Sequence, residues 1–268
     1  LGFYSSSQLV QDARRHGVEV LPVDVTVSDW ECTLEERTCD LSLITHHSSL
    51  ITAPAVRLGL LMVKGLSRAG AERIVAAYLQ SSFTNVEDLA RRAGLDRRDL
   101  HSLAAAGALA RLAGHRHLAH WQAAGMEALP RLLSEAPIRE SAPQLSVPTE
   151  GEDLIADYGS LGLTLGRHPL ALLRQRLRRM RLITASELNR LANGLPVRTA
   201  GIVTCRQRPS TAKGVVFVTL EDETGYVNVV VWRDLVEKHR RELLASSLLG
   251  VEGEIQREGE VVHLVARR

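Results

Sequence analysis

Residues 206–232 read RQRPSTAKGVVFVTLEDETGYVNVVVW and hold two runs of β-branched and aromatic residues. The two runs, 215–220 and 226–232, are joined by a short acidic turn that ends in Gly225. This pattern predicts a β-hairpin. The loop before the hairpin carries three cations, Arg206, Arg208 and Lys213. A cationic loop beside an aromatic-bearing hairpin is typical of a platform for single-stranded nucleic acid, because the charges bind phosphates and a ring stacks on bases.

The sequence around the hairpin has the same period of two. One more strand is predicted at 197–204, and two others at 248–256 and 261–266. An amphipathic helix is predicted at 233–245, between the third and fourth strands. Three strands, a helix and two strands form the order of an OB-fold. We therefore predict a C-terminal five-stranded OB-fold barrel over residues 196–268.

The strand at 215–220 alternates between two faces. Val216, Val218 and Leu220 suit the core of the barrel, which leaves Phe217 on the outer face. Because an OB-fold binds its ligand across this strand and the next, we expect Phe217 to stack on bases while the three loop cations hold the backbone. The alternative is a buried Phe217 beside a loop that is merely solvated.

A helix-hairpin-helix unit is predicted further upstream. An apolar run at 56–63, interpreted as a short helix, is followed by Lys64-Gly65-Leu66 and by a well-patterned helix at 67–79. Gly65 lets the backbone turn, and the first N–H groups of the second helix would face a phosphate. Lys64 and Arg68 would add positive charge at the same place.

A second hairpin follows the first. Asn85 is expected to cap a helix at 86–93 and Asp96 a helix at 97–105, and Gly107 then repeats the small-Gly-apolar turn. Residues 57–116 hold ten Arg and Lys against five Asp and Glu. Two hairpins within a basic block favour contact with a DNA backbone. A helical bundle with a solvated basic face is the alternative.

The helix expected after Pro169 is rich in arginine and has no acidic residue. Its arginines are Arg174, Arg176, Arg178, Arg179 and Arg181. This strip could lie along phosphates, with Arg174 and Arg178 as the candidate contacts. The alternative is a solvated face, or acidic partners elsewhere in the chain. At the other end of the chain, we expect a helix at 5–17, a strand at 18–25 and a loop over 28–56.

Several classes of site are not indicated. The C-x₆-C spacing of Cys32 and Cys39 fits no usual zinc pattern, and three cysteines favour a reducing, cytoplasmic environment. No apolar run approaches the roughly 20 residues of a membrane span, and the start is no signal peptide. No paired-aspartate, P-loop or nucleophile-elbow motif is present, so the segment is expected to need no cofactor. The missing initiator Met suggests a piece of a longer polypeptide.

Four motifs carry a resemblance to a known family. Three of them, LGFYSSSQLVQDARRHGVEVLPVDVTVSDW, RLGLLMVKGLSRAGAERIV and LGLTLGRHPLALLR, resemble parts of bacterial C-family (DnaE-type) polymerases. The hairpin RQRPSTAKGVVFVTLEDETGYVNVVVW is most similar to the error-prone, ImuC-like branch. The resemblance implies an α+β multidomain region. Its parts would be the end of the fingers (1–56), tandem helix-hairpin-helix (57–128), a linker (129–151), a helical connector (152–195) and the OB-fold (196–268).

The resemblance also implies a function. The implied protein is a DNA polymerase that carries out damage-induced translesion synthesis and binds both primed duplex and single-stranded template. Its catalytic aspartates and their Mg²⁺ ions would belong to a palm domain upstream of this chain. A Y-family-like partner is implied, and the sliding clamp would be reached indirectly, because LPRLL at 129–133 is a poor match to the clamp-binding pentapeptide.

Two other functions remain open. The pattern Phe217, Leu220, Asp222 also resembles the anticodon-binding OB domains of class II tRNA synthetases, which would make this an RNA-binding module. Alternatively, the face of the OB-fold could bind a partner polypeptide, since residues 196–268 are close to neutral.

Overall fold

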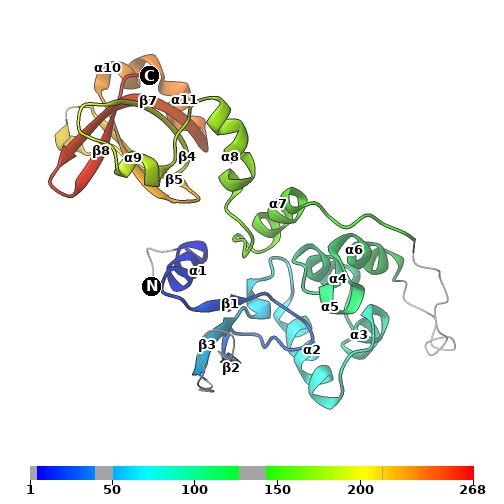
Figure 1. Ribbon diagram of the computed structural model, residues 1–268. Helices are drawn as coiled ribbons and strands as arrows, with labels where there is room; N and C mark the ends of the chain where they lie inside the picture. Colours follow the sequence, from blue (N-terminus) through cyan, green and yellow to red (C-terminus); the bar gives the residue numbers. More distant parts are fainter. Residues whose placement is uncertain (1–4, 40–50, 127–142, 213) are drawn as a thin grey trace. The chain divides into compact units, whose positions relative to one another are not determined.

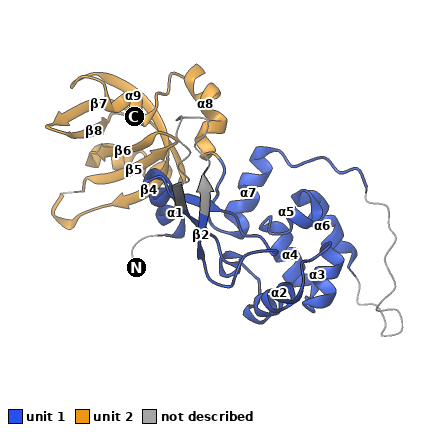
Figure 2. Cartoon of the chain, turned by 60° about the horizontal axis from the view of Figure 1, so that its bottom comes forward, with its two compact units in different colours: residues 1–166 blue, residues 167–268 orange. Residues whose placement is uncertain are grey.

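The computed structural model describes residues 5–39, 51–126, 143–212 and 214–268. Lys213 and residues 129–142 of the linker predicted at 129–151, which include the LPRLL stretch at 129–133, therefore lie outside the described residues. The chain forms two compact units, residues 1–166 and residues 167–268, which Figure 2 shows in different colours. The boundary falls inside the range 152–195 that was expected to form one connector.

Unit 1 begins with one helix and a small sheet (Figure 1). The elements are α1 (Ser6–Arg15), β1 (Glu19–Leu21), β2 (Thr33–Cys39) and β3 (Ile51–Arg57). β3 is the central strand, parallel to β1 and antiparallel to β2. The expected helix at 5–17 is confirmed, and Ser5 with Gln8 forms a capping box at its start.

The prediction of a loop over 28–56 is wrong. β2 and β3 pair in this range, with Thr33 opposite Arg57, and the guanidinium of Arg57 lies 2.7 Å from the carboxylate of Glu35. β2 reads TLEERTC, so it lacks the alternation of apolar residues by which a strand is recognised. Its one large apolar side chain, Leu34, is 78% exposed.

The helical part of unit 1 follows the predicted caps. Its elements are η1 (Leu60–Met62), α2 (Arg68–Gln80), α3 (Val86–Arg92), α4 (Arg97–Ala105), α5 (Ala110–Ala113), α6 (Arg116–Gly125) and α7 (Glu150–Ser160). Asn85 accepts from the N–H of Asp88 at 2.8 Å, and Asp96 accepts from the N–H of Asp99 at 2.7 Å. The expected first helix of the hairpin is a single 3₁₀ turn, because β3 runs on to Arg57.

Unit 2 is a closed barrel with helices attached. Its elements are α8 (Pro169–Arg179), α9 (Ala185–Asn189), β4 (Pro196–Gln207), η3 (Ser210–Ala212), β5 (Val216–Asp222), β6 (Gly225–Val231), α10 (Arg233–Lys238), α11 (Arg240–Ala245), β7 (Leu248–Glu258) and β8 (Val261–Ala266). The strand order β4-β5-β6-β8-β7 closes on itself, which confirms the predicted five-stranded OB-fold. The one helix expected at 233–245 is instead two short helices that meet at His239.

The core of the barrel follows the alternation of β5. Val216, Val218 and Leu220 are buried inside the barrel. β4 crosses β5 closely at Gly201, where a Cβ would meet the Cβ of Leu220 at 2.6 Å. A side chain at Gly201 would therefore push the two strands apart, which explains the glycine.

A buried ionic cluster attaches α8 and α9 to the barrel. The guanidinium of Arg174, on α8, binds the carboxylate of Glu223 and lies 3.3 Å from that of Asp222. Asp222 also accepts from the N–H of Ala185, the first residue of α9, at 2.8 Å. In the β5–β6 turn it accepts from the N–H and the hydroxyl of Thr224 and from the N–H of Gly225. One carboxylate thus joins the turn to both helices.

Removing this carboxylate is expected to destabilise unit 2 strongly. Asp222→Ala leaves the buried guanidinium of Arg174 with one acid fewer and strips the turn of its acceptor. We expect the unfolding free energy of unit 2 to fall by about 3–5 kcal/mol. Hydrogen exchange of barrel peptides in a urea series would measure it. Glu237→Ala, which removes the exposed partner of Arg233, is the matched control and should leave stability unchanged. Equal effects of both variants would contradict this role.

The same cluster predicts how unit 2 responds to acid. Burial raises the pKa of Glu223, but the hydrogen bond and charge of Arg174 outweigh it and hold this pKa below the ordinary 4.5. A carboxyl with a lowered folded-state pKa stabilises the fold above pH 4.5, and this stabilisation is lost as pH falls through the folded-state pKa. The stability gap between wild type and Glu223→Gln should therefore shrink below pH 4.5 in urea titrations. A gap that does not change with pH would count against the ion pair.

Candidate nucleic-acid interface

The outer face of the hairpin carries an exposed ring. Phe217 is 37% exposed and lies on β5 between Gln207 of β4 and Val230 of β6. Its neighbours in sequence, Val216 and Val218, are buried in the barrel. Phe217 therefore lies on the outer face, where the alternation of β5 placed it.

A second ring on this face was missed by the sequence reasoning. Trp232 is 56% exposed and follows β6 by one residue, with an extended backbone. It stands two residues after Val230, which pairs with Phe217, so the period of two continued past β6 assigns Trp232 to the same side as Phe217. The available signal was the period of two in β6, continued one residue past Val231.

The loop cations differ in what they contact. Arg206 donates to the carbonyls of Leu243 (2.7 Å) and Ser246, and so holds the end of α11. Arg208 is exposed and makes no hydrogen bond or ion pair within the described part of the chain. Lys213 lies outside the described residues. Arg208 is therefore the described loop cation whose guanidinium is fully available to a phosphate.

The two candidate phosphate contacts on α8, Arg174 and Arg178, also differ in their surroundings. Arg174 was expected to lie along phosphates, but the structure buries it against Asp222 and Glu223, so its guanidinium is already neutralised within the chain. Its pKa is raised, chiefly by the hydrogen bond to Glu223. Arg178 is exposed, and its nearest acidic partner is Glu187 at 3.9 Å. For Arg174, the alternative of acidic partners elsewhere in the chain is therefore the correct one, and these partners are Asp222 and Glu223.

In unit 1 the first hairpin contacts α7. The ammonium of Lys64 donates to the carbonyls of Tyr158 (3.2 Å) and Gly159 (3.3 Å), at the end of that helix. Gly65 has a φ of 88°, which confirms the tight turn. Arg68 is exposed; its guanidinium lies 2.9 Å from the carboxylate of Glu72 and 5.8 Å from the centre of the Trp30 ring.

The N-terminus of α2 is partly occupied by a carboxylate of the chain itself. Buried Asp99 accepts from the N–H and from the hydroxyl of Ser67 at 3.0 and 3.1 Å. Among the described residues, no acceptor is found for the N–H groups of Gly65, Arg68 and Ala69. Three backbone donors thus remain for a phosphate, beside one buried negative charge.

The second hairpin turn is covered by an arginine. Gly107 has a φ of 72°, and a Cβ there would meet the guanidinium of Arg116 at 3.0 Å. Arg116 itself binds Asp153 and Asp157 of α7. Because this ion-paired side chain lies against Gly107, the turn is less open to a phosphate than the turn at Gly65.

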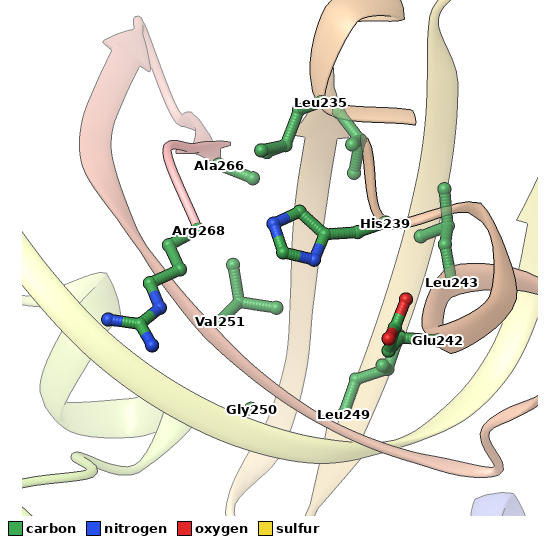
Figure 3. Close-up of a pocket in the computed structure, with 10 residues that line it drawn as sticks. Leu235, His239, Glu242, Leu243, Leu249, Gly250, Val251, Ala266 and Arg268 are labelled. Carbon is green, nitrogen blue, oxygen red and sulfur yellow. The ribbon is translucent and has the colours of Figure 1, made fainter. Parts of the chain in front are cut away.

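A mostly apolar pocket of about 240 Å³ lies between α10–α11 and the barrel (Figure 3). Figure 3 shows the ring of His239 directed into it, with Arg268 and Glu242 on opposite sides of that ring. The walls include Leu235 and Val251. The pocket shares no lining residue with the Phe217 face, and its apolar walls suit an apolar group rather than a phosphate.

The histidines of α4 and α6 do not assemble a metal site. The rings of His101 and His120 lie 4.9 Å apart, and burial, followed by the charge of His101, lowers the pKa of His120. No group of three or more metal-ligating side chains occurs among the described residues. In the same part of the chain, no helix is long and apolar enough to cross a membrane.

Comparison with known proteins agrees with this architecture. Residues 17–119 match a family model described as a helix-hairpin-helix motif, and residues 197–268 match an OB-fold nucleic acid binding domain. Among solved structures, an asparaginyl-tRNA synthetase from Pyrococcus horikoshii is 21% identical with a TM-score of 0.29, over 32% of this chain and 21% of that one.

The curated relatives match the whole chain. All 268 residues align at 54% identity with an error-prone DNA polymerase of Alkalilimnicola ehrlichii and at 55% with one of Azoarcus sp.. These alignments cover 25% and 24% of the relatives, so the chain spans about a quarter of their length. Over its whole length the chain is therefore homologous to error-prone DNA polymerases, and it corresponds to a quarter of such a protein, with a helix-hairpin-helix region followed by an OB-fold.

Proposed function

We propose that this chain is the DNA-handling C-terminal region of an error-prone DNA polymerase. The observation that carries the proposal is the identity of 54–55% with error-prone DNA polymerases over all 268 residues. The helix-hairpin-helix region grips duplex behind the primer terminus, and the OB-fold holds the single-stranded template. Neither unit supplies catalysis in this proposal, which leaves nucleotide transfer to a palm domain outside the chain, with its aspartates and Mg²⁺ ions.

The whole protein then acts in damage-induced translesion synthesis in the cytoplasm. It works with a Y-family-like partner, and it reaches the sliding clamp through that partner rather than directly. These roles go beyond the name of the relatives, which describes the polymerases only as error-prone. They rest on the family resemblance.

The OB-fold part of the proposal is supported by three neighbouring groups. Phe217 and Trp232 offer two exposed rings on one outer face, so each can stack on a base. The guanidinium of Arg208 has no partner in the described part of the chain, and the residue follows β4 directly, next to Gln207, which pairs with Phe217. This is the arrangement of charge and rings that single strands require.

The duplex part of the proposal is centred on the turn at Gly65. The N–H groups of Gly65, Arg68 and Ala69 are available to a phosphate, and the ammonium of Lys64, held by two backbone carbonyls of α7, supplies positive charge beside the turn. Backbone donors contact phosphates without reading sequence, which suits a polymerase that must accept any primer.

Contacts within unit 2 bear on the two alternative functions, tRNA binding and protein binding. The tRNA interpretation relied in part on Asp222, but this residue is 5% exposed and engaged with Arg174 and Ala185, so it has a structural role here. The protein-partner interpretation gains the apolar pocket beside His239. Preference for tRNA over DNA in competition would favour the tRNA interpretation. Binding of a protein partner without measurable DNA affinity would favour the protein-partner interpretation.

Loss of either ring should weaken single-strand binding. Stacking is worth roughly 1–3 kcal/mol per base, so Phe217→Ala and Trp232→Ala should each lower affinity roughly 5- to 150-fold. Fluorescence anisotropy with labelled single-stranded and primed duplex DNA measures this. Leu248→Ala is the matched control, since it removes a side chain that is 45% exposed on the same barrel. No binding of either DNA by wild type at low salt would overturn the proposed function.

Replacing Arg208 should affect DNA binding, whereas replacing Arg206 should affect stability. Arg208→Ala is expected to reduce the salt dependence of single-strand binding by about 0.7 in slope, because one phosphate contact is lost, and to leave stability unchanged. Arg206→Ala is expected to lower the unfolding free energy by about 1 kcal/mol, because it removes two hydrogen bonds at the end of α11. Salt titrations and urea denaturation of both variants test the contrast, and the reverse result would contradict the assignment.

A further inference from the structure

Four arginines gather at the end of α8 and just beyond it. This arginine patch consists of exposed side chains, Arg176, Arg178, Arg179 and Arg181. No Asp or Glu occurs between residues 158 and 186. Within the described part of the chain, the patch makes one ion pair, from Arg178 to Glu187 at 3.9 Å. The patch is therefore a concentration of largely unneutralised positive charge.

The backbone of Arg181 is unusual. Its φ is 58°, and no other residue except glycine has a positive φ among the described residues. It closes α8, with its N–H donating to the carbonyl of Arg178 at 2.9 Å and that of Leu182 to the carbonyl of Leu177 at 3.0 Å. This is a Schellman motif, whose left-handed position usually holds glycine because a Cβ is disfavoured there.

Other helices of this chain follow the usual choice. Glycines with positive φ stand after α1, α3, α4 and α7, namely Gly17, Gly94, Gly107 and Gly162. α8 alone among the helices that end in a left-handed residue within the described parts uses an arginine. Since the side chain of Arg181 is exposed and makes no hydrogen bond or ion pair there, the fold gains no contact from it.

The fold also gains little from the patch as a whole. Cations near the end of a helix interact favourably with its dipole, which accounts for some positive charge at this place. However, Arg176 and Arg179 are three residues apart on one helix, where like charges repel. Strain at Arg181 and repulsion within the patch both oppose folding. A residue kept in a strained conformation without a structural gain indicates a function.

We propose that the arginine patch binds the backbone phosphates of a nucleic acid. Guanidinium groups bind phosphate oxygens in a bidentate way, and a polyanion relieves the repulsion among them. The proposal rests on the proposed function but adds a second contact to unit 2. α8 is attached at the Asp222 end of β5, and Phe217 lies five residues away along that strand, or roughly 17 Å. The point at which α8 is attached to the barrel is thus distant from Phe217.

Arg181→Gly separates this role from any structural one. Glycine relieves the left-handed strain, so the Tm of unit 2 should rise by roughly 4 °C, while the salt slope of DNA binding should fall by about 0.7 for a single strand or 0.9 for a duplex. Arg181→Lys keeps the charge and should retain the wild-type slope. Anisotropy with single-stranded and duplex DNA identifies which backbone contacts the patch.

A second variant keeps the test independent of Arg181. Arg176→Gln combined with Arg179→Gln leaves the helix end intact and should reduce the slope by about 1.4–1.8. If the wild type binds DNA and both variants retain its affinity and slope, the patch proposal is overturned while the proposed function stands. If the wild type binds neither DNA, both fail. A higher Tm with weaker DNA binding in Arg181→Gly supports the patch.

Discussion

The carboxylate of Asp222 connects the β5–β6 turn of the barrel to α8 and α9. One oxygen accepts from Thr224 and Gly225 and shapes the β5–β6 turn, and the other accepts from Ala185 and lies near Arg174. Because the group is almost completely buried, each of these bonds is made away from competing water. α8 and α9 are thereby held on the barrel, and the arginine patch is held with them.

Arginines serve two different purposes in this chain. Arg174 and Arg206 are used internally, one against acids and the other against carbonyl oxygens at the end of α11. Arg208 and Arg181 have no such contacts within the described residues, so their charge is directed to solvent and to any anion there. The proposed binding surfaces follow from which guanidinium groups the fold leaves unpaired, rather than from where arginines occur in the sequence.

The fold was predictable where local pattern and burial agree. Alternation along 215–220 and the caps Asn85 and Asp96 encode elements that need only near neighbours, and all of these appear in the structure. β2 was missed because TLEERTC has no apolar face, so its pairing with β3 leaves no local trace. Trp232 was placed in the predicted run 226–232, but its exposure was not foreseen, because it follows the last residue of β6 and caps α10.

The sequence by itself determined the OB-fold, the helix-hairpin-helix order and the outward face of Phe217, since each follows from spacing within a few residues. Only the tertiary structure decided which charged side chains are available. Arg174 meets Glu223 across 49 positions, Arg206 meets Leu243 across 37, and Lys64 meets Tyr158 across 94. The physical reason is that a charge is neutralised by whatever the fold brings near it, and separations of this length are set by folding rather than by local pattern.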